Sequence, residues 1–176
     1  MGVINLKMLL ESQTLERAPF PVPMGWYHVD FSENLKPGEM RNVQLFGQEW
    51  VLFRTEGGVP GMSDPYCPHL GAHMGHGGKV CGEHLRCPFH HWEYDAEGWC
   101  KSVPYAKRIP PKARIKSWPS CEQNKMLFVW NDPDGGLPVP EQAIPRIDPV
   151  FQPDEWSDWS LVKWTIKANC RELVDN

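Results

Sequence analysis

Two short segments that each pair a cysteine with a histidine constrain this chain of 176 residues more than any other feature. The first segment, CPHLGAH, contains Cys67 and His69, and the second, CPFHHW, contains Cys87 and His90. In both segments a proline follows the cysteine, which fixes one φ angle and removes one backbone donor. Residues 70–86 separate the two pairs. The four side chains can therefore act together only if the chain folds two tight loops against each other.

Two thiolates and two imidazoles can bind a two-iron cluster, with both sulfur ligands on one iron and both nitrogen ligands on the other. The same four side chains could instead hold one zinc ion. Structural zinc sites usually take their cysteines from one C-x2–4-C pair and their histidines from positions three to five residues apart. Here each segment supplies one cysteine and one histidine. The pattern therefore favours a [2Fe–2S] cluster, with these ligands: Cys67, His69, Cys87 and His90.

Composition and patterning predict a fold that is mostly all-β. Glycine (15 residues) and proline (18 residues) are frequent, and both disfavour the interior of long helices. The nine tryptophans suit packed sheet surfaces. Short apolar runs separated by turn residues begin near Gly25, and turns are expected at Gly82–Glu83 and Asp95–Gly98. Strands are expected at 41–46, 48–54, 59–64, 113–118 and 125–130, and on both sides of the second turn.

The chain is expected to contain an N-terminal arm over 1–24, a main domain over 25–150 and the start of a further domain over 151–176. A proline-rich stretch that begins near Pro133 precedes the second boundary. Such a stretch is extended and does not fold alone, so it separates the two domains.

The last residues predict one strand and the beginning of a helix. Residues 158–168 carry the strand pattern, and Asn169 with Glu172 three positions later fits a capping box. Fewer than two helical turns follow before Asn176, and a helix so short is marginal without packing. The simplest interpretation is that the sequence continues in a longer protein.

The charge and the apolar runs exclude several classes of partner. The formal net charge is −4, whereas a nucleic-acid binder needs a basic excess for its phosphate contacts. No run approaches the ~18 apolar residues of a membrane span, and the N-terminus has no apolar run long enough for a secretory signal. We therefore expect a cytoplasmic protein in which the six cysteines are thiols or metal ligands. Four of them are expected to be ordinary thiols: Cys81, Cys100, Cys121 and Cys170.

From about Gly25 to Asn176 the chain resembles the Rieske non-haem iron oxygenases, and most of all their 3-ketosteroid 9α-hydroxylase and Rieske sterol desaturase branch. The segments that carry the resemblance are YCPHLGAHMGHGGKV, CPFHHWEYDAEGWC, VPYAKRIPPKARIKSW, FVW and NCRELVDN. The resemblance implies a Rieske-type antiparallel β-sandwich with a small cluster-binding subdomain. It places the four cysteines and histidines named above at the family's cluster ligands, and Trp92 beside a ligand loop.

The resemblance also implies that the domain relays electrons from a reductase to a mononuclear Fe(II) in an oxygenase that acts on steroid-like or sterol-like substrates. In the family that iron is held by two histidines and a carboxylate, which would lie beyond Asn176, and the parent protein is a homotrimer. His73 and His76 have no acidic partner near them in the sequence, and His84 lies on the predicted hairpin. No catalytic residue is therefore expected in this chain, which alone should not be competent for oxygenation.

Two further interpretations remain open at this point. The chain could be a stand-alone Rieske ferredoxin, although a carrier needs neither the proline-rich linker nor the extra strand. A basic stretch without acidic residues could dock the reductase or could simply be solvated surface. Its members are Lys101, Lys107, Arg108, Lys112, Arg114 and Lys116.

Overall fold

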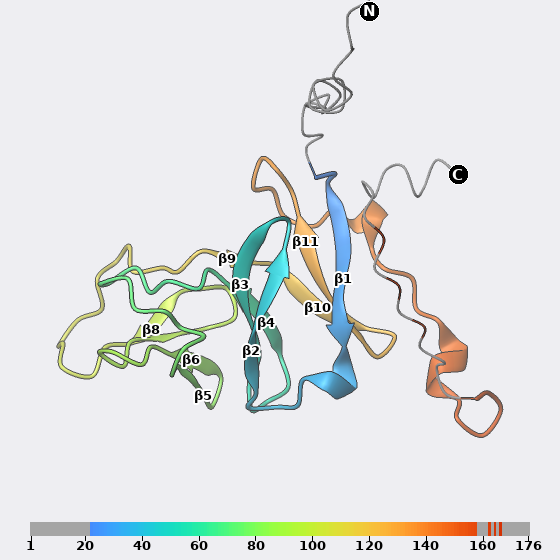
Figure 1. Cartoon of the computed structure of the whole chain (residues 1–176), viewed down its shortest axis with the longest axis horizontal. Helices are drawn as coiled ribbons and strands as arrows, with labels where there is room; N and C mark the ends of the chain where they lie inside the picture. The colour runs from blue at the N-terminus through green and yellow to red at the C-terminus, as the bar shows by residue number, and fades with distance from the viewer. Residues whose placement is uncertain (1–21, 158–161, 163, 165, 167–176) are drawn as a thin grey trace, which may run out of the picture. The chain divides into compact units, whose positions relative to one another are not determined.

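The computed structural model describes residues 22–157, together with 162, 164 and 166 (Figure 1). The described residues fall into two compact units, which meet in the sequence between Ile144 and Pro145. The predicted arm over 1–24 lies almost wholly outside the described residues, as do the predicted strand over 158–168 and the helix start at Asn169. The domain boundary near residue 150 stays a prediction.

The described part of the first unit contains three antiparallel sheets and two single-turn 3-10 helices, so the all-β expectation is confirmed. None of its helices is long or apolar enough to cross a membrane. The first sheet has the strand order β1-β11-β10. Its strands are β1 (Gly25–Phe31), β10 (Ser120–Gln123) and β11 (Met126–Asn131), and the 3-10 helices are η1 (Ser32–Asn34) and η2 (Pro140–Gln142).

The second sheet has the order β2-β3-β4-β9 and packs against the first sheet. Its strands are β2 (Met40–Leu45), β3 (Gln48–Arg54), β4 (Pro60–Ser63) and β9 (Ser117–Trp118). The core between the two sheets consists of six buried side chains, namely Leu35, Trp50, Leu52, Met62, Leu127 and Val129. These two sheets form the sandwich of the molecule.

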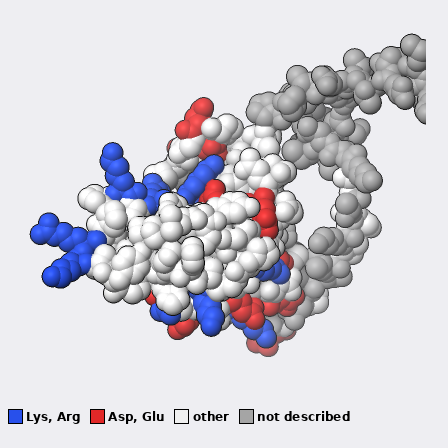
Figure 2. Space-filling view, turned by 60° about the vertical axis from the view of Figure 1, so that its left-hand side comes forward, with Lys and Arg blue, Asp and Glu red and all other residues white. Residues whose placement is uncertain are grey.

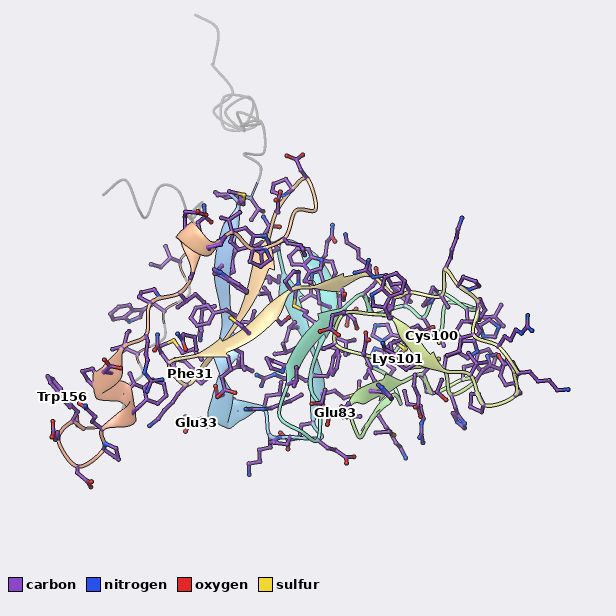
Figure 3. The ribbon with its side chains drawn as sticks, turned by 180° about the vertical axis from the view of Figure 1, so that it is seen from behind. Phe31, Glu33, Glu83, Cys100, Lys101 and Trp156 are labelled. Carbon is purple, nitrogen blue, oxygen red and sulfur yellow. The ribbon has the colours of Figure 1, made fainter. Side chains whose placement is uncertain are left out.

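The third sheet is small and has the order β5-β6-β7-β8. Its strands are β5 (Lys79–Cys81), β6 (His84–Arg86), β7 (Glu93–Tyr94) and β8 (Cys100–Ser102). Figure 3 shows Cys100 and Lys101 of β8 on the opposite side of this unit from Phe31 of β1. A second core joins this sheet to β3, and its apolar members include Val51, Phe53, Met74, Leu85, Tyr94 and Ile115.

Strand β3 has both faces buried, because its side chains alternate between the two cores. Trp50 and Leu52 belong to the core of the sandwich, whereas Val51 and Phe53 belong to the core of the third sheet. All four side chains are at most 2% exposed. The apolar run WVLF therefore reflects a strand at the centre of three layers, rather than one with a solvated face.

The second unit is described from Pro145 to Ser157 and at three later positions. It contains the 3-10 helix η3 (Asp148–Phe151). The Arg146 guanidinium lies 3.8 Å from the centre of the Phe151 ring, and its Nε donates to Asp148 at 2.8 Å.

The predicted turns are present, and one predicted strand is shorter than expected. The turn at Gly82–Glu83 joins β5 to β6, and Gly98 N donates to Asp95 O at 3.0 Å. In the stretch 113–118 only Ser117 and Trp118 form a strand. The preceding residues bond instead to the hairpin of β7 and β8, where Cys100 N donates to Ala113 O and Ile115 N donates to Gly98 O. The sequence pattern does not resolve β1 and β10 as separate strands.

Gly98 should be far less tolerant of a side chain than Gly82, although both have positive φ angles. Alanine costs about 1–2 kcal/mol in this backbone region at either position. At Gly98 a Cβ would also collide with Ile115 O, whereas at Gly82 nothing lies within 4 Å. We expect Gly98→Ala to lower the melting temperature by roughly 2–10 °C more than Gly82→Ala. Thermal unfolding followed by circular dichroism checks this, and equal melting temperatures would contradict it.

Candidate metal centre

The two ligand loops repeat the same backbone conformation. The first follows β4 and the second joins β6 to β7. Cys67 N donates to Ala72 O at 2.9 Å, and Cys87 N donates to Trp92 O at 2.8 Å, so each cysteine closes a loop of equal length. Four residues after each cysteine the chain turns through a positive φ angle, +73° at Gly71 and +59° at His91. The equal loops explain how two short segments, each with one proline, can present their side chains to a common point.

Both cysteines are buried in the core of the third sheet and form no disulfide. Each is only 2% exposed. Burial raises the pKa of the Cys67 thiol; the hydrogen bond from Tyr94 lowers it, and the nearby Cys87 raises it again. Two thiolates this close in an apolar core would require a cation between or beside them.

The Tyr94 hydroxyl lies 3.3 Å from Cys67 Sγ. Burial raises the pKa of Tyr94 far above its ordinary value, and its hydrogen bond to Cys67 raises it further. The phenol therefore keeps its proton, and against a thiolate it acts as the donor. Tyr94 is a residue of the site that spacing alone does not indicate, because it lies on β7 and outside both ligand loops.

The two histidines lie together at the rim of the same core. The ring centres of His69 and His90 are 4.8 Å apart, and both residues are half-buried. Trp92 stacks on His69 with ring centres 4.5 Å apart and planes 9° apart, as the resemblance implies. The indole Nε1 of Trp92 donates to the Tyr105 hydroxyl at 2.6 Å, which fixes the stacked ring in place.

The donor set fits a two-iron cluster. The structure brings the two pairs predicted from the sequence to one place, with the sulfurs buried and the imidazoles nearer to solvent. Thiolates and imidazoles in a two-plus-two set are the ligands that such clusters use. Neither thiol is in a disulfide, so both sulfurs are available to bind metal.

Of the other cysteines, Cys100 is buried in the same core and Cys121 is half-buried on β10. Burial raises the pKa of both thiols. They therefore remain protonated near neutral pH, as expected for ordinary thiols. Cys81 is half-buried, and Cys170 lies outside the described residues.

His73 and His76 have no acidic residue near them in the sequence, but folding brings a carboxylate from another strand to His73. Glu49 Oε2 of β3 lies 3.4 Å from His73 Nε2, because folding brings β3 beside the first ligand loop. His84 also has a carboxylate partner, with its Nδ1 3.4 Å from Glu93 Oε2. The sequence pattern indicates neither the His73–Glu49 contact nor the His84–Glu93 contact. The His73–Glu49 contact joins residues far apart in the chain.

The basic stretch is not uniform. All six residues are exposed, and Figure 2 shows Lys and Arg side chains projecting on its left-hand side. Lys101 Nζ forms an ion pair with Asp95 at 2.9 Å, and Arg114 donates to Glu97 O and lies 4.7 Å from the centre of the Trp99 ring. The six residues therefore differ in their contacts within the chain: Lys101 and Arg114 already interact with neighbouring groups.

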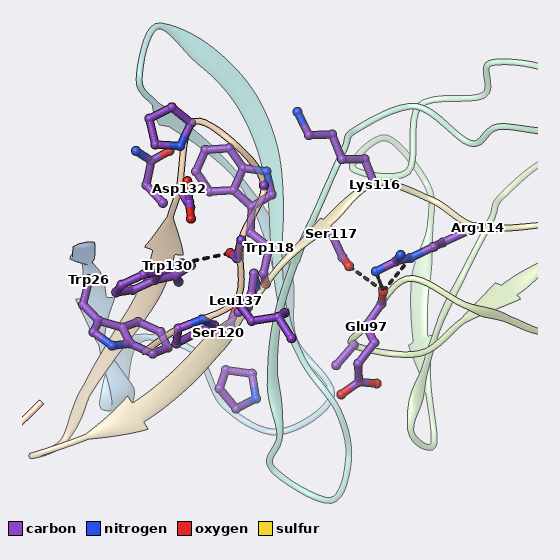
Figure 4. Close-up of a pocket in the computed structure, with 18 of the residues that line it drawn as sticks. Trp26, Glu97, Arg114, Lys116, Ser117, Trp118, Ser120, Trp130, Asp132 and Leu137 are labelled. Carbon is purple, nitrogen blue, oxygen red and sulfur yellow. Dashed lines mark hydrogen bonds between the residues drawn. The ribbon is translucent and has the colours of Figure 1, made fainter. Parts of the chain in front are cut away.

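A pocket of about 530 Å³ lies between the sandwich and the 132–138 loop (Figure 4). Three tryptophans line it, namely Trp26, Trp118 and Trp130, and Trp130 Nε1 donates to Gly136 O at 3.1 Å. None of the four predicted ligands is part of its lining.

Two family models match the chain. One is described as the Rieske [2Fe-2S] domain and matches residues 25–119; the other, the 3-Ketosteroid 9alpha-hydroxylase C-terminal domain, matches residues 129–176.

Among curated proteins, the oxygenase component of a 3-ketosteroid-9-alpha-monooxygenase from Rhodococcus rhodochrous is 40% identical over 153 residues. This match covers 86% of the chain and 40% of the relative. Cholesterol 7-desaturase nvd 1 from Ciona intestinalis is 41% identical over 128 residues, 73% of the chain and 27% of the relative. The chain thus spans about two fifths or less of these relatives.

Among solved structures, apo dicamba monooxygenase is similar with a TM-score of 0.59 and 28% identity, over 73% of this chain and 39% of that one. The relatives confirm the resemblance to the ketosteroid hydroxylase and sterol desaturase branch. Since the first family model covers more than half of the residues, including both ligand loops, the chain belongs to the Rieske [2Fe–2S] domain family.

Proposed function

We propose that this chain holds a Rieske-type [2Fe–2S] cluster and passes electrons from a reductase to a mononuclear non-haem iron in an oxygenase of steroid-like or sterol-like substrates. The observation that carries the proposal is the pair of buried, unbridged cysteines beside two adjacent imidazoles, on loops of matching conformation. The proposed ligands are Cys67, His69, Cys87 and His90. The names of the relatives support the substrate class.

When bound, the cluster supplies a one-electron carrier, and the surrounding residues define its two ends. Cys67 and Cys87 lie deep in the apolar core, so anionic ligands face away from solvent. His69 and His90 lie at the rim, where neutral ligands can approach a partner's surface. Trp92 holds the plane of the His69 ring, and Tyr94 donates to the Cys67 sulfur.

The remaining parts of the proposal concern the longer protein. The mononuclear Fe(II) would be held by residues outside this chain, and the domain over 25–150 would meet it across a subunit boundary in a homotrimer. The match of residues 129–176 to a hydroxylase C-terminal domain supports this arrangement over a stand-alone ferredoxin.

Cluster ligation predicts two irons and two labile sulfides per purified chain. His69→Cys should lower the midpoint potential and change the visible spectrum, because an anionic ligand replaces a neutral one. His91→Asn is a matched control, since His91 is exposed next to a ligand and asparagine tolerates its positive φ angle. Metal and sulfide analysis with spectroelectrochemistry tests this. One zinc and no sulfide per chain would refute the assignment.

Tyr94→Phe should lower the midpoint potential of the cluster. A donor to a sulfur ligand stabilises the added electron of the reduced state, and this variant removes one such donor. Tyr105→Phe removes a hydroxyl that accepts from Trp92 and contacts no sulfur, so its potential should stay close to the unmodified value. Equal potentials for both variants would show that the Tyr94 contact does not tune the cluster.

Reduction by the cognate reductase should slow when the exposed basic residues are neutralised. We expect the double variant Lys107→Gln/Arg108→Gln to be reduced more slowly at low salt and to lose most of its salt dependence, because steering by exposed charges is screened over ~10 Å at 0.1 M. Lys36→Gln/Lys79→Gln makes the same change in net charge elsewhere on the surface. Stopped-flow reduction at several ionic strengths measures the effect, and identical behaviour of the two variants would leave the basic end as solvated surface.

A further inference from the structure

A second group of metal-binding side chains lies apart from the four cluster ligands. Glu49 is on β3, whereas His73 and His76 are on the loop between β4 and β5. One potential ligand atom from each of the three side chains lies within 4.8 Å of the others. The sequence pattern does not predict this group, because its carboxylate and its imidazoles come from different parts of the chain.

The packing of β3 explains why the carboxylate reaches this loop. Side chains at alternate positions of a strand share a face, so Glu49 points to the same side as Val51 and Phe53. Those two side chains pack in the core that contains Met74, the residue next to His73. Glu49 therefore stands at the edge of this core, opposite the histidines.

The loop backbone holds the two histidines in place. His73 forms an antiparallel bridge with Tyr66, and Met74 N donates to Pro65 O at 2.6 Å. His76 N donates to His73 O at 3.2 Å, so the chain turns between the two imidazoles. Their ring centres are 4.1 Å apart at an interplanar angle of 37°. The backbone turn of the loop therefore places the two imidazole rings side by side.

The His73 ring lacks the partners that a buried imidazole normally has. Its side chain is only 14% exposed, and both ring nitrogens are buried without a hydrogen bond. Nε2 lies 3.4 Å from Glu49 Oε2, but the two atoms do not meet hydrogen-bond geometry. Buried polar atoms nearly always have a partner, so an orphaned imidazole beside a carboxylate points to a missing ligand.

A simple ion pair does not account for this arrangement. His84 and Glu93 are also 3.4 Å apart, but Arg86 binds the Glu93 carboxylate as well, at 2.6 Å and 2.7 Å. No lysine or arginine among the described residues pairs with Glu49, and a second imidazole stands beside the first. The two sites therefore differ in what neutralises the carboxylate.

We propose that Glu49, His73 and His76 bind a divalent transition-metal ion of the Zn²⁺ class. Two imidazoles and one carboxylate form a ligand set that zinc uses in proteins, with a fourth position left to water. Metal–ligand bonds of about 2.0–2.1 Å place tetrahedral ligand atoms roughly 3.4 Å apart. The separation of His73 Nε2 from Glu49 Oε2 is 3.4 Å. His76 is exposed, which gives the ion a route from solvent.

The bound ion would tie the first ligand loop to β3. His73 is on the loop that contains Cys67 and His69, whereas Glu49 is on the strand shared by both cores. An ion held by both would restrict the movement of the loop relative to the sandwich. The proposed role is structural, and it does not depend on the electron-transfer function proposed above.

Zinc binding to the full chain, purified with its iron, tests the proposal. The protein is freed of loosely bound metal with a chelator and dialysed against Zn²⁺, after which zinc, iron and labile sulfide are measured. We expect one zinc per chain, with iron and sulfide contents unchanged. Zinc that enters only as iron is lost would show binding at the cysteine site and would overturn the proposal.

Three variants identify the ligands. His76→Asn and Glu49→Gln should weaken zinc binding at least ten-fold, since each removes one of three ligands; His76 is exposed, so its replacement should leave the fold intact. His84→Asn is the matched control, because it removes a histidine at the same distance from a carboxylate. The melting temperature should rise with Zn²⁺ in the unmodified protein and in this control, but not in His76→Asn. Equal zinc affinity in all three variants would overturn the assignment.

Discussion

The double-sided burial of β3 is the constraint on which the rest of this structure depends. Trp50 and Leu52 close the core between the two large sheets, whereas Val51 and Phe53 close the core under the small sheet. Each such side chain contributes about 1.5–3 kcal/mol by its burial. Because one strand serves both cores, the sandwich and the cluster-binding subdomain form one packed body. A polar residue at any of these four positions would therefore destabilise the sandwich and the cluster-binding subdomain together.

The core under the small sheet also places the proposed cysteine and histidine ligands at different depths. The cysteines are part of the core itself, beside Tyr94, whereas the histidines lie at its rim. There Trp92 stacks on His69, and the Phe89 ring lies tilted against His90. A thiolate in such a core is costly without a cation, so the two thiols would lose their protons only as they bind metal. The same packing leaves only the imidazole side near solvent, which is the side a redox partner would approach.

The two histidines of the first ligand loop, His69 and His73, therefore contact different groups of residues. His69 turns toward His90 and Trp92, whereas His73 turns toward Glu49 and His76. A backbone bridge between Tyr66 and His73 closes this loop. If both metals bind, the loop is held from two sides, by the core at its cysteine and by β3 at His73.

The sequence by itself determined the features that depend on local spacing. The Cys–His pairs, the turns at Gly82–Glu83 and Asp95–Gly98, and the excess of glycine and proline predict the ligand loops, the hairpins and the all-β class. Only the tertiary structure decided which distant side chains meet. Tyr94 reaches Cys67 from β7, Glu49 reaches His73 from β3, and residues 113–115 bond to the hairpin of β7 and β8 instead of extending β9. Turns and ligand pairs are fixed by neighbours in the chain, whereas these contacts depend on how the sheets pack, and no short-range pattern encodes that packing.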